Sequence, residues 1–130
     1  MRARFGITDR VRGEGRAMSA VDLAETAAGL PEAWSSRVLG MVGAACVKVL
    51  RMDELPVAEE SHGDAEALLV LDGRLELEVD GVPVSVGAGE LFLVPAGTAH
   101  AVRPGSRGTL VIVEWSVPVD DGLERSGGGH

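Results

Sequence analysis

Short apolar segments separated by glycine and proline turns dominate this chain after residue 34. Between Leu75 and Val79, apolar residues alternate with acidic ones. This alternation predicts a strand with one buried face and one solvent-exposed face. Asp80-Gly81 then predicts a tight hairpin turn before the alternation resumes. Similar runs lie at 38–52, broken near Gly43, and at 68–79, 91–94, 100–102 and 109–115. Strands of this length and spacing predict an all-β sandwich or barrel.

One short helix is expected before the strands, near residues 20–29. Ser19 is a suitable N-cap with Asp22 three residues later, and Gly29 followed by Pro31 predicts the end of the helix. A length of 130 residues allows one domain with one core. We therefore expect a folded domain over 18–119, a disordered basic extension over 1–17 and a disordered tail over 120–130.

The charge balance narrows the range of partners. The chain carries a formal charge of −8, with net +3 in residues 1–17 and −11 in the remainder. This acidic body argues against nucleic acid and anionic membrane as partners, and no apolar run reaches the roughly 18 residues of a membrane span. The single cysteine, Cys46, excludes an internal disulfide and fits a reducing, cytoplasmic location. A homodimer is expected, because small barrels commonly cover a sheet edge with a partner.

One histidine, His62, stands close in sequence to several carboxylates. Glu60 and His62 are two residues apart and would share one face of a strand, and Glu66 would join them from the next strand. Together with His100, they offer imidazole nitrogens and carboxylate oxygens, which suit Mn, Fe, Co, Ni or Zn. The alternatives are that His100 only caps a turn or fills the core and that Glu60 is a surface acid. Cys46 is better explained as a small buried thiol than as a ligand.

The spacing of these residues resembles the two motifs of the cupins, the RmlC-like superfamily of small barrels. The matching positions are His62, Glu66 and Gly73 in the first motif, and Gly89, Pro95, Gly97 and His100 in the second. The resemblance implies a small single-domain protein of the Cupin_2 type with a double-stranded β-helix, or jelly-roll, barrel. It also implies a divalent metal ion, Mn, Fe, Ni or Zn, held by Glu60, His62, Glu66 and His100. Glu60 stands where the family has its first histidine; a second carboxylate favours Mn or Fe(II), and a metal-free site stays open.

The function that the resemblance implies is broad. Cupins include isomerases, cyclases, lyases and dioxygenases, and the fold does not choose among them. Strand alternation predicts pocket walls that would accept a small, largely apolar organic molecule: Leu68, Val70, Phe92, Val102 and Trp115. A non-catalytic module that binds a small molecule or a metal is the alternative. No serine has a setting that suggests a hydrolytic triad.

Overall fold

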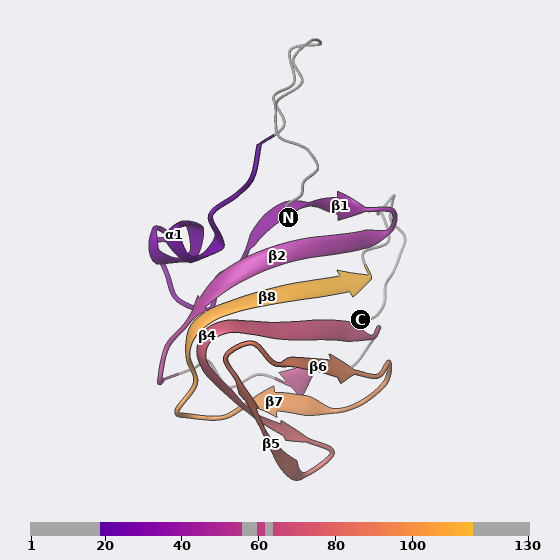
Figure 1. Cartoon of the computed structure of the whole chain (residues 1–130). Coiled ribbons are helices and arrows are strands. Elements are labelled where there is room, and N and C mark those ends of the chain that lie inside the picture. The colour runs from indigo at the N-terminus through magenta and orange to yellow at the C-terminus, as the bar shows by residue number, and fades with distance from the viewer. Residues whose placement is uncertain (1–18, 56–59, 62–63, 116–130) are drawn as a thin grey trace.

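A computed structural model describes residues 19–55, 60–61 and 64–115 and shows strands preceded by one short helix (Figure 1). The elements are α1 (Leu23–Ala28), β1 (Arg37–Val42), β2 (Ala45–Met52), β3 (Glu60–Ser61), β4 (Glu66–Val79), β5 (Val82–Gly87), β6 (Leu91–Val94), β7 (His100–Val102) and β8 (Arg107–Trp115). The predicted all-β fold with one N-terminal helix is confirmed. The segments predicted at 1–17 and 120–130, and the domain limits at 18 and 119, lie outside the described residues.

Helix α1 begins three residues later than the sequence suggested. The N-cap is Asp22 and not Ser19, because the Asp22 carboxylate accepts a hydrogen bond of 3.0 Å from the backbone N–H of Glu25. Gly29 caps the end of the helix, as predicted. Within the described residues, no helix has the length and apolar character that crossing a membrane requires.

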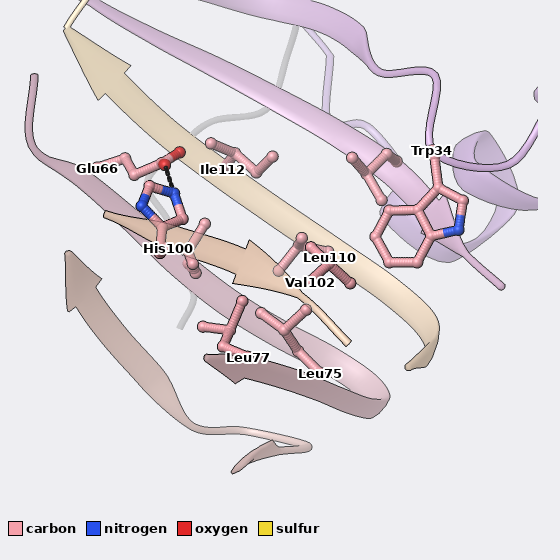
Figure 2. Close-up of a pocket in the computed structure, with 10 residues that line it drawn as sticks. Trp34, Glu66, Leu75, Leu77, His100, Val102, Leu110 and Ile112 are labelled. Carbon is pink, nitrogen blue, oxygen red and sulfur yellow. Dashed lines mark hydrogen bonds and ion pairs between the residues drawn. The ribbon is translucent and has the colours of Figure 1, made fainter. Parts of the chain in front are cut away.

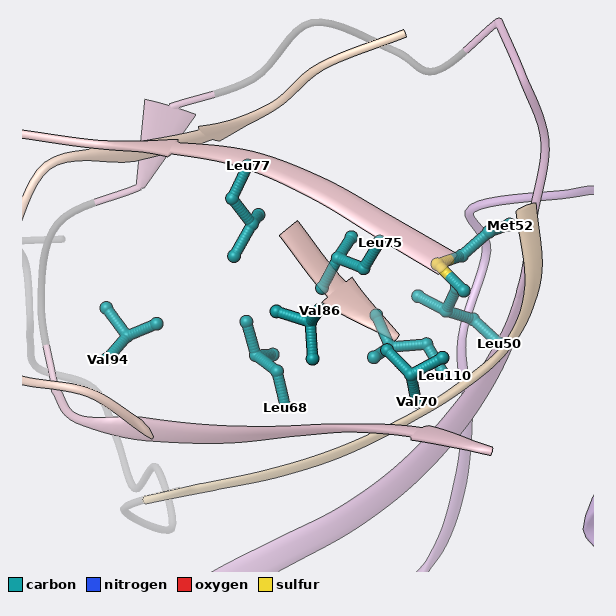
Figure 3. Packing of buried hydrophobic residues seen from close by; sticks show 9 residues of the cluster. All are labelled: Leu50, Met52, Leu68, Val70, Leu75, Leu77, Val86, Val94 and Leu110. Carbon is teal, nitrogen blue, oxygen red and sulfur yellow. The ribbon is translucent and has the colours of Figure 1, made fainter. Parts of the chain in front are cut away.

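The strands form one antiparallel sheet that is organised around β4. The sheet order is β1-β2-β8-β4-β7-β3, and β5 and β6 also pair with β4. The first half of β4 pairs with β6 and β8, whereas its second half pairs with β5 and β7. The sheet folds over at the middle of β4, so Leu68 and Val70 from one half point toward Leu75 and Leu77 from the other (Figure 3). A single strand therefore contributes to both walls of the interior.

The fold-over depends on a β-bulge and a close crossing of β4 and β8. The pairing register shifts between Val70 and Asp72, which leaves Leu71 as the extra residue. Before the bulge the even-numbered residues of β4 face inward, and after it the odd-numbered ones do. Gly73 follows with a φ of 83°, and a Cβ there would overlap the backbone oxygen of Arg107. Only glycine fits this crossing without displacing β8.

The interior is filled by aliphatic side chains from both walls. The buried cluster comprises Leu50, Met52, Leu68, Val70, Leu75, Leu77, Val86, Val94 and Leu110. On the outside of the sheet a smaller cluster forms where Ala27 of α1 packs with Val49 and Val111. Helix α1 thus covers part of the outer face of β2 and β8. The inner face is left to form the core and, at one end, the candidate site.

Candidate metal centre

Glu66 and His100 meet inside the fold. Glu66 is the first residue of β4 and His100 is the first residue of β7. The Glu66 Oε2 atom lies 2.8 Å from the His100 Nε2 atom (Figure 2). The side chains are 14% and 11% exposed, respectively, so water is mostly excluded from the pair. They come from opposite ends of the predicted motif region. The structure therefore brings together two of the four predicted metal ligands.

The hydrogen bonds of His100 define which atom faces Glu66. Its Nδ1 atom lies 3.0 Å from the backbone oxygen of Thr98, and a carbonyl oxygen can only accept, so Nδ1 carries the proton. In the neutral imidazole, Nε2 then presents its lone pair toward the Glu66 carboxylate. Two acceptors at 2.8 Å need a proton or another cation between them. The same Nδ1 contact to a backbone carbonyl orients metal-ligating histidines in general.

The electrostatics of Glu66 favour such a cation. Burial, the largest effect, raises the pKa of Glu66, and the nearby Glu114 carboxylate raises it further. His100 and Lys48 act in the opposite direction without cancelling the shift. A carboxylate with a raised pKa in a dry setting is stabilised by a proton or by a bound cation. The donor atoms and their surroundings fit a divalent metal ion.

The other two predicted ligands are only partly placed. The backbone of Glu60 pairs with Ala101, and that of Ser61 pairs with His100, so β3 runs beside β7. His62 lies outside the described residues. In the part of the chain that the structure describes, no three His, Cys, Asp or Glu side chains are close enough to hold a metal ion together. Glu60 and His62 as ligands stay predictions.

An apolar cavity of about 290 Å³ extends from the Glu66–His100 pair into the core. Its lining consists of Trp34, Leu50, Glu66, Leu68, Leu75, Leu77, His100, Val102, Leu110 and Ile112. Glu66 and His100 are its only ionisable lining residues among those described. Figure 2 shows this pair at one end and Trp34 at the other. The cavity suits a small molecule with one polar end and an apolar body.

Trp34 has an unusual backbone conformation that the sequence did not reveal. Its φ is 66°, in the left-handed region that bulky residues rarely adopt. The backbone N–H of Trp34 donates a hydrogen bond of 2.8 Å to the oxygen of Arg51, which fixes the loop against β2. The Arg51 guanidinium in turn donates to the carbonyl oxygens of Ala27 and Leu30 at 3.0 and 2.8 Å. This arrangement holds the indole at the end of the cavity.

Of the five residues predicted to form pocket walls, the structure places two in the lining of the cavity. Leu68 and Val102 line the cavity. Val70 is fully buried in the core and Phe92 packs against the core cluster, and neither is among the residues that line the cavity. Trp115 is not a pocket wall and is 56% exposed. The inward residues of β8 have even numbers, so alternation places Trp115 on the outer face.

The sequence of this chain matches a known protein family. The Cupin_2 family, described as a cupin domain, matches residues 52–116, which is half of the chain. The chain is a cupin. One similar protein is quercetin 2,3-dioxygenase of Bacillus subtilis (strain 168), which is 40% identical over 58 residues. The match includes 45% of this cupin but only 16% of the length of the dioxygenase.

Solved structures support the fold of this cupin. A cupin-2 domain protein from Shewanella frigidimarina NCIMB 400 is 20% identical, with a TM-score of 0.64 over 73% of this chain and 93% of that chain. Hydroquinone 1,2-dioxygenase PnpCD, in complex with Cd²⁺ and 4-hydroxybenzonitrile, is 19% identical, with a TM-score of 0.68 over 88% of this chain and 83% of that chain. At these identities the likeness concerns the fold alone. The predicted membership of the RmlC-like cupins is confirmed.

Proposed function

We propose that this cupin binds a divalent metal ion at the Glu66–His100 pair and acts on a small, largely apolar organic molecule in the adjoining cavity. The observation that carries the proposal is the 2.8 Å approach of the Glu66 Oε2 atom to the His100 Nε2 atom at the polar end of that cavity. His62 and Glu60 would complete the ligand set by their motif positions. Two carboxylates in the set favour Mn or Fe(II) over softer ions.

Each part of the site has a separate task in this proposal. The Thr98 carbonyl holds the imidazole of His100 in the tautomer that presents Nε2 to the ion. The aliphatic walls bind the apolar part of the ligand and exclude water from the reacting end. A bound ion would supply Lewis-acid polarisation or, if it is iron, activation of dioxygen.

The 40% identity to quercetin 2,3-dioxygenase over 58 residues favours oxygen chemistry within this proposal. A non-catalytic binding module is the second candidate. It is supported by the cavity lining, in which the two described ionisable residues would both be metal ligands and leave no separate acid or base. Oxygen uptake by metal-loaded protein in the presence of hydroquinone would favour the enzyme. Metal binding without turnover of this or other small phenols would favour the module.

The test of the metal site is elemental analysis combined with thermal melting. Protein purified without added metal or chelator should contain a divalent ion near one equivalent. After chelator treatment, a metal added at a hundred times its Kd should stabilise the fold by about 2.7 kcal/mol, which raises Tm by about 10 °C for a domain of this size. Mn, Fe(II), Ni and Zn are each compared. A protein that carries no ion and shows no shift with any of them contradicts the proposal.

Two substitutions at Glu60 test whether its carboxylate is a ligand. Glu60→Gln keeps the size but removes the charge that would help to neutralise the ion, so the metal-dependent rise in Tm should shrink. Glu60→His restores the usual cupin histidine and should keep or strengthen the response to Zn and Ni, which imidazole suits. If both variants respond like the parent, Glu60 is a surface acid, and the site consists of the other three residues.

We also propose that the cupin forms a homodimer through the edge strand β1. Val38, Met41 and Val42 on this strand are 57%, 50% and 71% exposed, and among the described strands β1 ends the sheet order with one side unpaired. An apolar edge of this kind is normally covered. Sedimentation at micromolar concentration should give about twice the chain mass of 13.5 kDa, and Val42→Lys should shift it toward the monomer. A parent that sediments as a monomer would contradict this.

A further inference from the structure

A row of polar residues crosses the inner face of three neighbouring strands at the metal end of the cavity. Glu114 of β8 pairs in register with Glu66 of β4 on one side and with Cys46 of β2 on the other. Two residues further along β2, Lys48 pairs in register with Ile112 of β8, and Ile112 lines the cavity. Residues paired in this way share one face of the sheet, with Cβ atoms roughly 5 Å apart. Glu66 thus has a second carboxylate directly beside it.

Lys48 forms an ion pair with this second carboxylate. Its Nζ atom contacts Oε2 of Glu114, and the two side chains are 21% and 32% exposed. Two carboxylates directly opposite each other on a sheet destabilise it, and the ammonium group of Lys48 compensates for that repulsion.

Lys48 is the one described cation that shares the inner face of these strands with Glu66. Arg74, Arg103 and Arg107 contact the acidic side chains of Glu76, Glu78 and Glu54 in exposed positions. Arg51 is directed to the carbonyl oxygens at the end of α1. Arg37 pairs in register with Val49, whose side chain packs on the outer face. Lys48 does not itself line the cavity, but it pairs in register with Ile112, which does, so it is the described cation on this face beside the cavity wall.

We propose that Lys48 is a specificity-determining residue that selects small apolar molecules with a single anionic group, such as a carboxylate or a phenolate. The proposal rests on the proposed function, because it names the class of ligand that the same cavity accepts. The ammonium group exchanges Glu114 for the anionic group of the ligand, while the apolar body occupies the aliphatic cavity. No bond is made or broken in this step. The Glu114 partner keeps Lys48 oriented when no ligand is bound.

Benzoate and its neutral isostere benzamide test this selection by calorimetric titration of the protein as purified. The parent should bind benzoate more tightly than benzamide. Lys48→Met keeps the length of the side chain and removes its charge, so benzoate should bind about tenfold more weakly or worse, with benzamide unchanged. Glu114→Gln frees Lys48 from its competitor and should tighten benzoate binding. The double variant, Lys48→Met with Glu114→Gln, leaves neither side chain as an unpaired charge. It replaces Lys48→Met in the benzoate titration if the single variant does not fold.

The outcomes separate this inference from the proposed function. Equal affinity of the parent and both Lys48 variants for benzoate would overturn the role of Lys48. Absence of benzoate binding by the parent would overturn it as well. The metal-dependent rise in Tm should survive in the Lys48 variants, because Lys48 is not a metal ligand. If that rise is absent from the parent too, the metal site itself is wrong, whatever the probes show.

Discussion

Gly73→Ala should cost the fold about 3 to 5 kcal/mol of unfolding free energy. The left-handed backbone at this position, with φ of 83°, accounts for about 1 to 2 kcal/mol once a Cβ is present. The remainder comes from overlap of that Cβ with the backbone oxygen of Arg107, which cannot rotate away as a side chain would. A loss of this size is a large part of the stability of a small domain. Urea unfolding followed by circular dichroism measures it.

Gly89→Ala is the matched control for this effect. Gly89 has nearly the same φ, 82°, but a Cβ added there meets no atom within 4 Å. Its cost should be about 1 kcal/mol, which is the backbone contribution alone. Similar losses in the two variants would show that the crossing of β4 and β8 is not what requires glycine. A Gly73→Ala protein that is already unfolded in buffer, beside a folded Gly89→Ala protein, agrees with the prediction.

His100→Ala should abolish the metal response of the cupin. The substitution removes the Nε2 atom that faces Glu66 and leaves that buried carboxylate without its partner. Metal affinity should fall at least about 100-fold, since even residues that only orient a ligand contribute about 10- to 100-fold. At the metal concentration that raises the Tm of the parent by about 10 °C, the variant should gain about 2 °C or less.

His130→Ala controls for the loss of one histidine. His130 lies beyond both cupin motifs, so its removal should leave the metal response unchanged. His62→Ala should behave like His100→Ala if the motif position of His62 is a ligand position. A normal metal response in His100→Ala would contradict the candidate centre. Circular dichroism of each metal-free variant shows whether the lost response reflects the site or a lost fold.

The strands and turns of this cupin were predictable because they depend on local chemistry. Asp80 and Gly81 both have positive φ and join β4 to β5, as the Asp-Gly pair indicated. Leu75 and Leu77 are buried, which is what the alternation with glutamates required. The resemblance to the cupin motifs implied that Glu66 and His100 share one site, and the two side chains meet at 2.8 Å. Proximity of these two residues needed no knowledge of the packing between them.

The tertiary structure alone decided which face each strand presents along its whole length. Alternation predicts faces only within a regular strand, and the bulge at Leu71 reverses the inward face of β4 halfway along it. The bulge lies in the pairing of β4 with β8, a partner more than 30 residues away in sequence, so local alternation does not reveal it. Pairing across β2, β8 and β4 likewise placed Glu114 beside Glu66, brought Lys48 into contact with Glu114 and left Trp115 outside. Residue types and spacing determined the family and the candidate ligands, whereas strand pairing determined the cavity and the charges around it.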